Sequence, residues 1–198
     1  YPIKEDIERL SLICRVADID SKRSEEEERT INNELERSIY NPKSIKKLWK
    51  NIQKKPLELK DIFYDKTVEE KLEYYELAVK SAIIDNDLVH EERELLSDIQ
   101  KIADISPLSV RNIHELVIVE NDITLVSIDD FKISSGINNN GKDDEIALSY
   151  KKLGRSYFEK NNIAKSIENY KVALKKFILL ENEREINNCS KILALIEE

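Results

Sequence analysis

The chain has 198 residues, a net charge of −8 and only three glycines, all of which follow residue 135. An average protein of this length carries about 14 glycines. Phosphate-binding loops need glycine to bring backbone N–H groups onto the ligand, so residues 1–135 hold neither a dinucleotide-binding loop nor a Walker-type loop. Tight hairpins of antiparallel sheets are disfavoured for the same reason. These counts predict an all-α fold, and the negative charge argues against nucleic acid or an anionic membrane surface as a partner.

Two cysteines, Cys14 and Cys189, are too few for a disulfide framework. We expect both to be buried as small apolar side chains in a reducing compartment. No apolar run approaches the roughly 18 residues of a membrane span, and no signal peptide is recognisable. The composition therefore indicates a cytoplasmic protein. A start at Tyr1 in place of Met indicates a fragment or a trimmed chain, which leaves open a removed targeting segment.

Apolar residues at spacings of three and four predict helices along almost the whole chain. Two capping boxes, Ser24 with Glu27 and Thr67 with Glu70, mark helix starts. Prolines that follow Asn41 and Ser106 mark two more. The expected helices span about 3–17, 24–39, 42–55, 67–82, 90–103, 106–119, 144–160, 163–180 and 182–197.

Residues 121–143 have a different character, and we expect them to link two domains. They open with a β-prone run, residues 123–128, which predicts a short extended segment. Residues 134–144 show no apolar periodicity and hold two of the three glycines, as is typical of a flexible linker. The predicted domains are therefore a helical domain over residues 1–120 and a set of helices over residues 144–198.

Two acidic segments each join the end of one predicted helix to the start of the next, and they are related by an offset of 67 residues. Clustered carboxylates suit a divalent cation, here calcium or zinc. Ordinary helix capping is the plainer interpretation of the same residues. The candidate metal ligands are Asp18, Asp20 and Glu25 in the first segment and Asp85, Asp87, Glu91 and Glu92 in the second.

Residues 81–106 (SAIIDNDLVHEERELLSDIQKIADIS) resemble the core motif of the TerB-like (tellurite-resistance) domain, and the first acidic segment is similar to the paired copy in that family. Asn86 and Ile19 stand where the family has glycine. The resemblance implies an all-α domain of about seven helices with an acidic surface, sometimes associated with divalent metal. It also implies a role in bacterial stress response without catalysis. The matching residues are Asp85, Leu88, Glu91, Glu92, Glu94, Leu95, Leu96, Ile105 and Ser106.

Residues 147–180 resemble a tetratricopeptide (TPR) repeat. Leu153-Gly154, Tyr157, Tyr170 and Ala173 fall at the spacing of that family, and Gly154 would let two helices approach closely. A generic helical hairpin is the plainer interpretation. Because a single repeat cannot bury its own face, it docks on the first domain, is followed by further repeats, or self-associates. The sequence leaves these three arrangements open.

The TPR resemblance implies a peptide-binding surface on the first helix of the hairpin, where Lys151, Arg155 and Phe158 would lie. Two basic side chains there would suit a peptide carboxylate. A lysine-rich stretch, residues 43–60, surrounds Trp49 and taken alone suggests nucleic acid or an anionic membrane. A solvated helix face explains it more simply. An acidic partner surface, such as the Glu25–Glu28 run of this same protein, and peripheral membrane association are left open.

We therefore expect a non-catalytic protein-interaction scaffold of bacterial stress-response type. It would bind a protein or peptide partner through the TPR-like helices and an acidic TerB-like surface. The alternative is a regulatory domain that binds a divalent metal through its acidic turns. His90 and His114 fall on separate helices without a recognisable catalytic motif, so we expect no enzymatic activity. The partner and the oligomeric state stay open.

Overall fold

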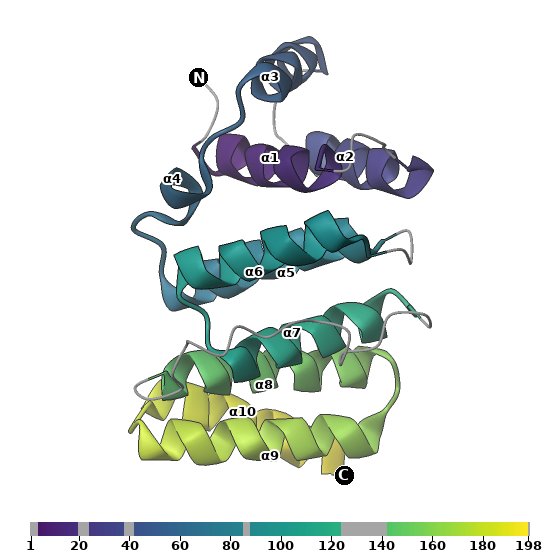
Figure 1. The fold of residues 1–198 in the computed structure, drawn as a ribbon. Helices are drawn as coiled ribbons and strands as arrows, with labels where there is room; N and C mark the ends of the chain where they lie inside the picture. The colour runs from purple at the N-terminus through teal and green to yellow at the C-terminus, as the bar shows by residue number, and fades with distance from the viewer. Residues whose placement is uncertain (1–3, 20–23, 38–41, 85–87, 124–141, 198) are drawn as a thin grey trace.

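The computed structural model describes residues 4–19, 24–37, 42–84, 88–123 and 142–197. These ranges hold ten helices and no strand, which confirms the all-α prediction (Figure 1). None of these helices has both the length and the apolar character that crossing a bilayer demands. The helices are α1 (Lys4–Ala17), α2 (Glu25–Arg37), α3 (Pro42–Lys54), α4 (Leu59–Phe63), α5 (Val68–Ile83), α6 (His90–Ala103), α7 (Pro107–Glu120), α8 (Asp143–Glu159), α9 (Ile163–Leu179) and α10 (Glu183–Glu197).

The predicted helix starts are present as side-chain hydrogen bonds. Glu70 N–H donates to Thr67 Oγ1 at 3.2 Å, and Thr67 N–H donates to the Glu70 carboxylate at 2.8 Å. Ser24 and Glu27 make the same reciprocal pair ahead of α2. The Ser106 side chain caps α7. Because these bonds satisfy N–H groups that have no partner inside the helix, the helices begin where the sequence predicts.

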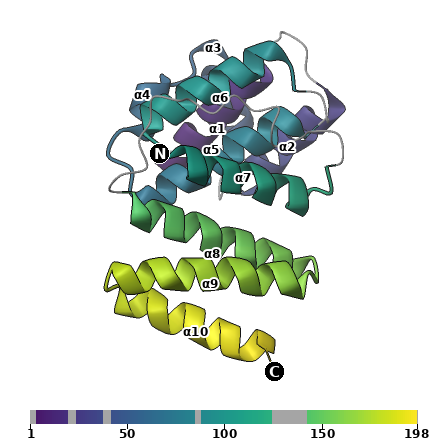
Figure 2. The ribbon, with the colours of Figure 1, turned by 60° about the horizontal axis from the view of Figure 1, so that its bottom comes forward.

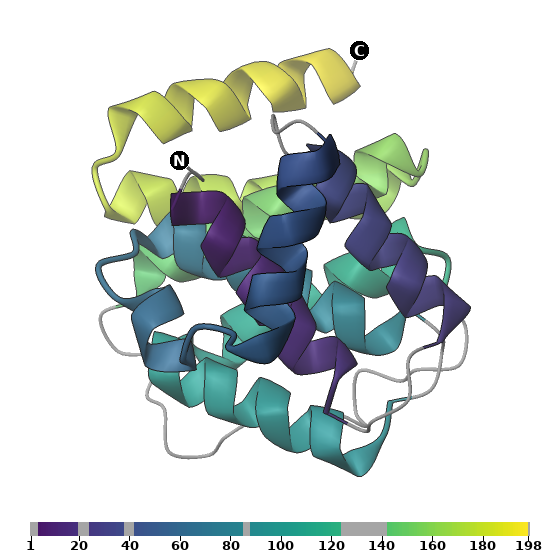
Figure 3. The ribbon, with the colours of Figure 1, turned by 90° about the horizontal axis from the view of Figure 1, so that it is seen from above.

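α5 is the central helix of the first seven. It contacts α1, α6, α7 and α8, and it buries residues around most of its circumference. Its exposed residues, Glu69 and Glu73, are confined to one side, so most of the helix is suited to an interior position. Tyr74 and Tyr75 are among the largest fully buried side chains. α3 packs on the outer side of α1 through Ile45 and Ile52, and it crosses α1 in the view from above (Figure 3).

The sequence did not predict α4. A helix of five residues is too short to show a 3.6-residue period, yet it buries Ile62 and Phe63 in the main core. With α4 the described residues before position 121 hold seven helices, in line with the expected bundle of about seven. Of the predicted extended segment, residues 123–128, only Ile123 is described. The rest of it and the loop over residues 134–141 lie outside the described residues.

The last three helices lie side by side in chain order, with α9 between α8 and α10 (Figure 2). α8 and α9 meet at Gly154, where an added Cβ would lie 3.1 Å from Tyr170 Cδ2 and 3.3 Å from the backbone oxygen of Ser166. The Ser166 hydroxyl also donates to the Gly154 carbonyl at 2.8 Å. The close helix approach predicted from Gly154 is therefore confirmed.

α8 also docks on the first seven helices. Its Leu153 and Tyr157 belong to the main hydrophobic core. Two buried polar contacts fix its position on α7: Asn112 Nδ2 donates to Ser149 Oγ at 2.9 Å, and Ser106 N–H donates to Glu145 Oε1 at 2.8 Å. Of the three arrangements that the sequence left open, the structure therefore shows the one in which the last three helices dock on the first seven.

Candidate functional site

The first acidic turn is described only in part. Asp18 is exposed and accepts a hydrogen bond from Cys14 Sγ at 3.1 Å. Glu25 is exposed at the first position of α2, and Asp20 lies outside the described residues. Asp18 thus has a local partner that needs no metal.

In the second acidic turn, Asp85 and Asp87 lie outside the described residues. Glu91 is exposed, whereas Glu92 is buried and its carboxylate accepts the Val89 N–H at 3.0 Å. Glu92 therefore caps α6. Across the described ranges, no group of three or more His, Cys, Asp or Glu side chains could hold a metal ion. The metal prediction rests on the aspartates outside those ranges and stays a prediction.

Equivalent helix positions of the two acidic segments are separated by a different number of residues from the one that the sequence repeat suggests. Glu27 and Glu92 both stand at the third position of a helix, and each accepts the N–H of the residue three positions earlier. They are 65 positions apart, whereas the 67-residue repeat pairs Glu92 with Glu25. The two segments therefore share a way of starting a helix, and their acidic residues do not match one by one.

The three residues predicted to bind a peptide lie together in one groove of 630 Å³ between α8 and α10. Lys151, Arg155 and Phe158 line it from α8, and Tyr170 lines it from α9. Glu69 and Glu73 of α5 reach it from the first seven helices. We call this the α8–α10 groove; its other lining residues are Leu148, Lys152, Glu159, Ile192, Leu195 and Ile196.

The three basic side chains of the α8–α10 groove each have an acidic partner. Lys151 Nζ lies 2.6 Å from Glu185, and Lys152 Nζ lies 3.0 Å from Glu76. Arg155 Nε lies 2.8 Å from Glu159, and this hydrogen bond raises the pKa of Arg155.

Two carboxylates that line the groove, Glu69 and Glu73, are not paired in this way in the part of the chain that the structure describes. Within the described residues, no ion pair engages Glu69 or Glu73, although both are exposed. Sequence reasoning missed these two residues because they come from α5, and no local pattern links α5 to α8. The groove thus combines apolar walls with neutralised cations and two unpaired carboxylates.

A polar cavity of 790 Å³ lies where α1, α2, α5, α7 and α8 meet. Arg9 and Glu34 form an ion pair there at 3.0 Å, as do Lys152 and Glu76. Burial, and then the charge of Glu76, raise the pKa of the Glu120 carboxyl. The ion pairs that line this cavity therefore connect neighbouring helices to one another.

The two histidines have opposite environments. His90 is exposed, with Nε2 3.3 Å from Glu94. His114 is buried, with Nε2 2.9 Å from the Tyr75 hydroxyl, and burial lowers the pKa of His114 to about 3. His114 is therefore neutral near pH 7 and belongs to the core.

Comparison with known proteins finds no match to the chain among family models, curated proteins or solved structures. The TerB-like and TPR-like resemblances remain hypotheses that rest on the residues quoted for them.

Proposed function

We propose that the chain is a non-catalytic interaction scaffold whose α8–α10 groove binds an apolar, basic segment of a partner protein. The observation that carries this proposal is that Phe158 and Leu195, two large exposed apolar side chains of the last three helices, line the groove. Of the seven large apolar side chains exposed in the described ranges, Tyr64 alone lies elsewhere. Concentrated apolar exposure is typical of interaction sites. The other six are Phe158, Ile163, Ile178, Leu179, Leu180 and Leu195.

The groove supplies the apolar part of the contact. Leu195 is 75% exposed and Phe158 is 49% exposed, and they face the space between α8 and α10 with Leu148 and Ile192. A partner side chain that buries itself there removes apolar surface from water on both sides. Full burial of one large apolar side chain contributes about 1.5–3 kcal/mol.

Charge favours a basic residue on the bound segment. An incoming carboxylate would compete with Glu185 for Lys151 and with Glu159 for Arg155. A lysine or arginine would instead meet Glu69 and Glu73, which pair with no cation among the residues that the structure describes. Complementary charge at the rim of an interface adds mainly specificity and association rate.

The two resemblances agree with this role. Lys151, Arg155 and Phe158 were expected at a peptide-binding surface because of the TPR resemblance, and they line the same groove. The TerB resemblance supports a place for the scaffold in bacterial stress response, in the cytoplasm. An acidic surface on the first seven helices would then offer a second contact for protein partners.

The test is selection of short random peptides, displayed on phage, against the full chain. We expect the selected peptides to combine apolar residues with lysine or arginine. Leu195→Glu should weaken their binding at least tenfold, because it places a charge in the apolar groove. Glu73→Lys should weaken the basic peptides selectively.

Leu179→Glu is the matched control, since Leu179 is 80% exposed and does not line the groove. This variant should bind as the parent chain does. Equal loss in Leu179→Glu and Leu195→Glu, or binding unchanged in Leu195→Glu, would overturn the proposal.

A further inference from the structure

α3 carries a row of lysines that pair with no carboxylate of the described residues. Four exposed side chains form what we call the α3 lysine face: Lys46, Lys47, Lys50 and Lys54. No carboxylate in the described ranges lies within 4.0 Å of any of them, whereas ten of the other sixteen lysines whose side chains are described each lie 2.6–3.9 Å from one. The ten paired lysines are Lys4, Lys66, Lys101, Lys142, Lys151, Lys152, Lys160, Lys165, Lys171 and Lys176.

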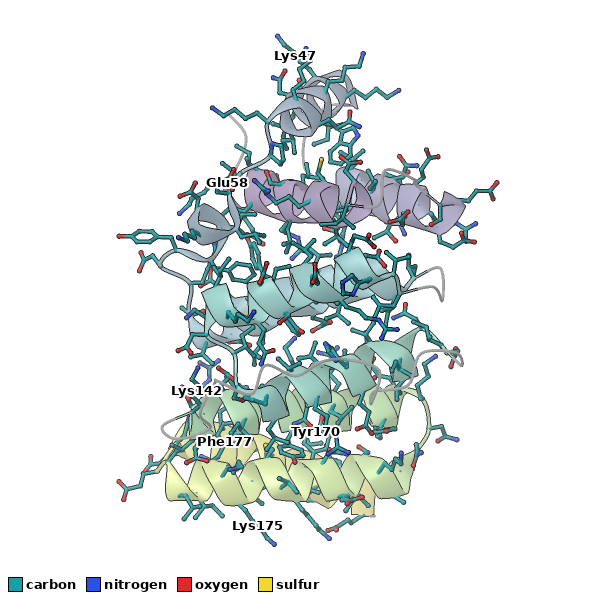
Figure 4. All side chains as sticks on the ribbon, in the orientation of Figure 1. Lys47, Glu58, Lys142, Tyr170, Lys175 and Phe177 are labelled. Atoms are coloured by element: carbon teal, nitrogen blue, oxygen red, sulfur yellow. The ribbon has the colours of Figure 1, made fainter. Side chains whose placement is uncertain are left out.

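The packing of α3 explains why these lysines share one side. Ile45 and Ile52 are buried against α1, which turns the opposite side of the helix outward. Lys46, Lys50 and Lys54 follow one another at intervals of four residues and therefore lie along one stripe. α3 occupies the end of the molecule opposite α9 and α10 (Figure 1), and Lys47 points away from the rest of the chain (Figure 4).

The net charge of −8 does not cancel this local charge. Screening reduces the influence of charges beyond about 8 Å at physiological ionic strength. α3 has 13 residues and is about 20 Å long, so a surface that touches it senses mainly the charges of α3 itself. The segment Pro42–Lys54 contains no aspartate or glutamate.

The chemistry of the α3 lysine face suits an extended anionic surface better than a nucleic acid. Between Arg37 and Arg93 the chain has no arginine, the residue that binds phosphate in bidentate fashion and stacks on bases. The other exposed residues of α3 with described side chains are Ser44, Asn51 and Gln53, so this face offers no exposed aromatic ring for base stacking. Lysines on a convex helix act as point charges, and a bilayer rich in anionic headgroups attracts them without a pocket.

We propose that the α3 lysine face binds the anionic headgroup surface of a lipid bilayer. The binding is peripheral and electrostatic, since Ile45 and Ile52 are already buried and do not enter the lipid. It is independent of the α8–α10 groove, whose lining comes from α5, α8, α9 and α10. A chain held through α3 would keep those helices on its far side from the bilayer (Figure 1).

The experiment is sedimentation of the full chain with vesicles. Vesicles of phosphatidylcholine and phosphatidylglycerol in equal parts should bind the chain, and vesicles of phosphatidylcholine alone should not. Each lysine near an anionic leaflet strengthens binding about fivefold. Lys46→Gln, Lys47→Gln, Lys50→Gln and Lys54→Gln in one variant should therefore lower the affinity by more than a hundredfold. Salt at about 1 M, where the screening length falls to about 3 Å, should abolish binding of the parent chain.

The matched control removes the same charge from other exposed lysines, in a variant that changes Lys101, Lys171, Lys175 and Lys191 to glutamine. It should retain binding to the anionic vesicles, and circular dichroism should show that both variants keep the helical content of the parent. Equal loss in the two variants would overturn the proposal, as would unchanged binding of the α3 variant. The proposal would also be overturned if the chain bound a random-sequence RNA but did not sediment with the anionic vesicles at the same protein concentration.

Discussion

Gly154→Ala tests whether the contact between α8 and α9 depends on a missing side chain. The new Cβ would lie 3.1 Å from Tyr170 Cδ2 and 3.3 Å from Ser166 O. Tyr170 is buried, and the Ser166 oxygen belongs to the helix backbone of α9, so neither atom moves away freely. The methyl group therefore pushes α8 and α9 apart and stretches the 2.8 Å bond between the Ser166 hydroxyl and the Gly154 carbonyl.

Two opposing contributions decide the size of the effect. Alanine favours a helix interior over glycine by about 1 kcal/mol. Inserting a methyl group into a well-packed contact costs about 1–3 kcal/mol. We expect the second contribution to prevail, with a net loss of about 1 kcal/mol in the free energy of unfolding. Equilibrium unfolding in urea measures this difference directly.

A stabilisation of about 1 kcal/mol in Gly154→Ala would refute the reasoning, because it would show that helix propensity acts alone. Tyr170→Leu provides the matched background, since it removes the ring atoms nearest to the new Cβ. Gly154→Ala should cost less in that background than in the parent chain. A double-mutant cycle isolates this coupling from the separate cost of Tyr170→Leu.

The remaining predictions concern buried polar groups. His114 is neutral in the folded chain because burial lowers its pKa to about 3, while the unfolded chain binds a proton near pH 6.5. The contribution of this group to the free energy of unfolding is complete above pH 6.5 and falls as the pH drops toward 3. Between pH 7 and pH 5 the free energy of unfolding of the parent should therefore fall by about 2 kcal/mol more than that of His114→Phe. Identical losses in the two chains, measured by urea unfolding, would contradict this account. Glu145→Ala should cost about 1–3 kcal/mol because it leaves the buried Ser106 N–H unsatisfied, whereas Glu145→Gln keeps an acceptor and should cost less; equal costs would count against this role for the carboxylate.

Local patterns in the sequence are sufficient to predict most of the helices. The capping boxes at Ser24 and Thr67 and the proline start after Ser106 are decided by residues within three positions of each other, and all three are present. α4 was not predicted because five residues are too few to show the 3.6-residue period of a helix. The same local rules predict Glu27 as part of a capping box, whereas Glu92 follows Val89, whose side chain cannot complete one.

The candidate site depends on contacts between distant parts of the chain, and those the sequence does not reveal. Lys151, Arg155 and Phe158 could be placed on one helix from their spacing. Glu159, the partner of Arg155, lies four positions along the same helix and fits a local pattern. The partner of Lys151 could not be predicted, since Glu185 lies on α10, and neither could Glu69 and Glu73, which reach the groove from α5. The docking of α8 likewise depends on buried pairs such as Asn112 with Ser149, which are ordinary polar residues until the fold brings them together.

α8 contributes side chains to two hydrophobic cores. Its Leu153 belongs to the main core, its Ala147 belongs to the core of the last three helices, and Leu148 packs against both. Loss of either core would expose apolar side chains of α8 to water, so the two should melt in one cooperative transition. A segment that binds α8 in the groove would consequently protect α5 and α7 as well, and hydrogen exchange would slow far from the contact.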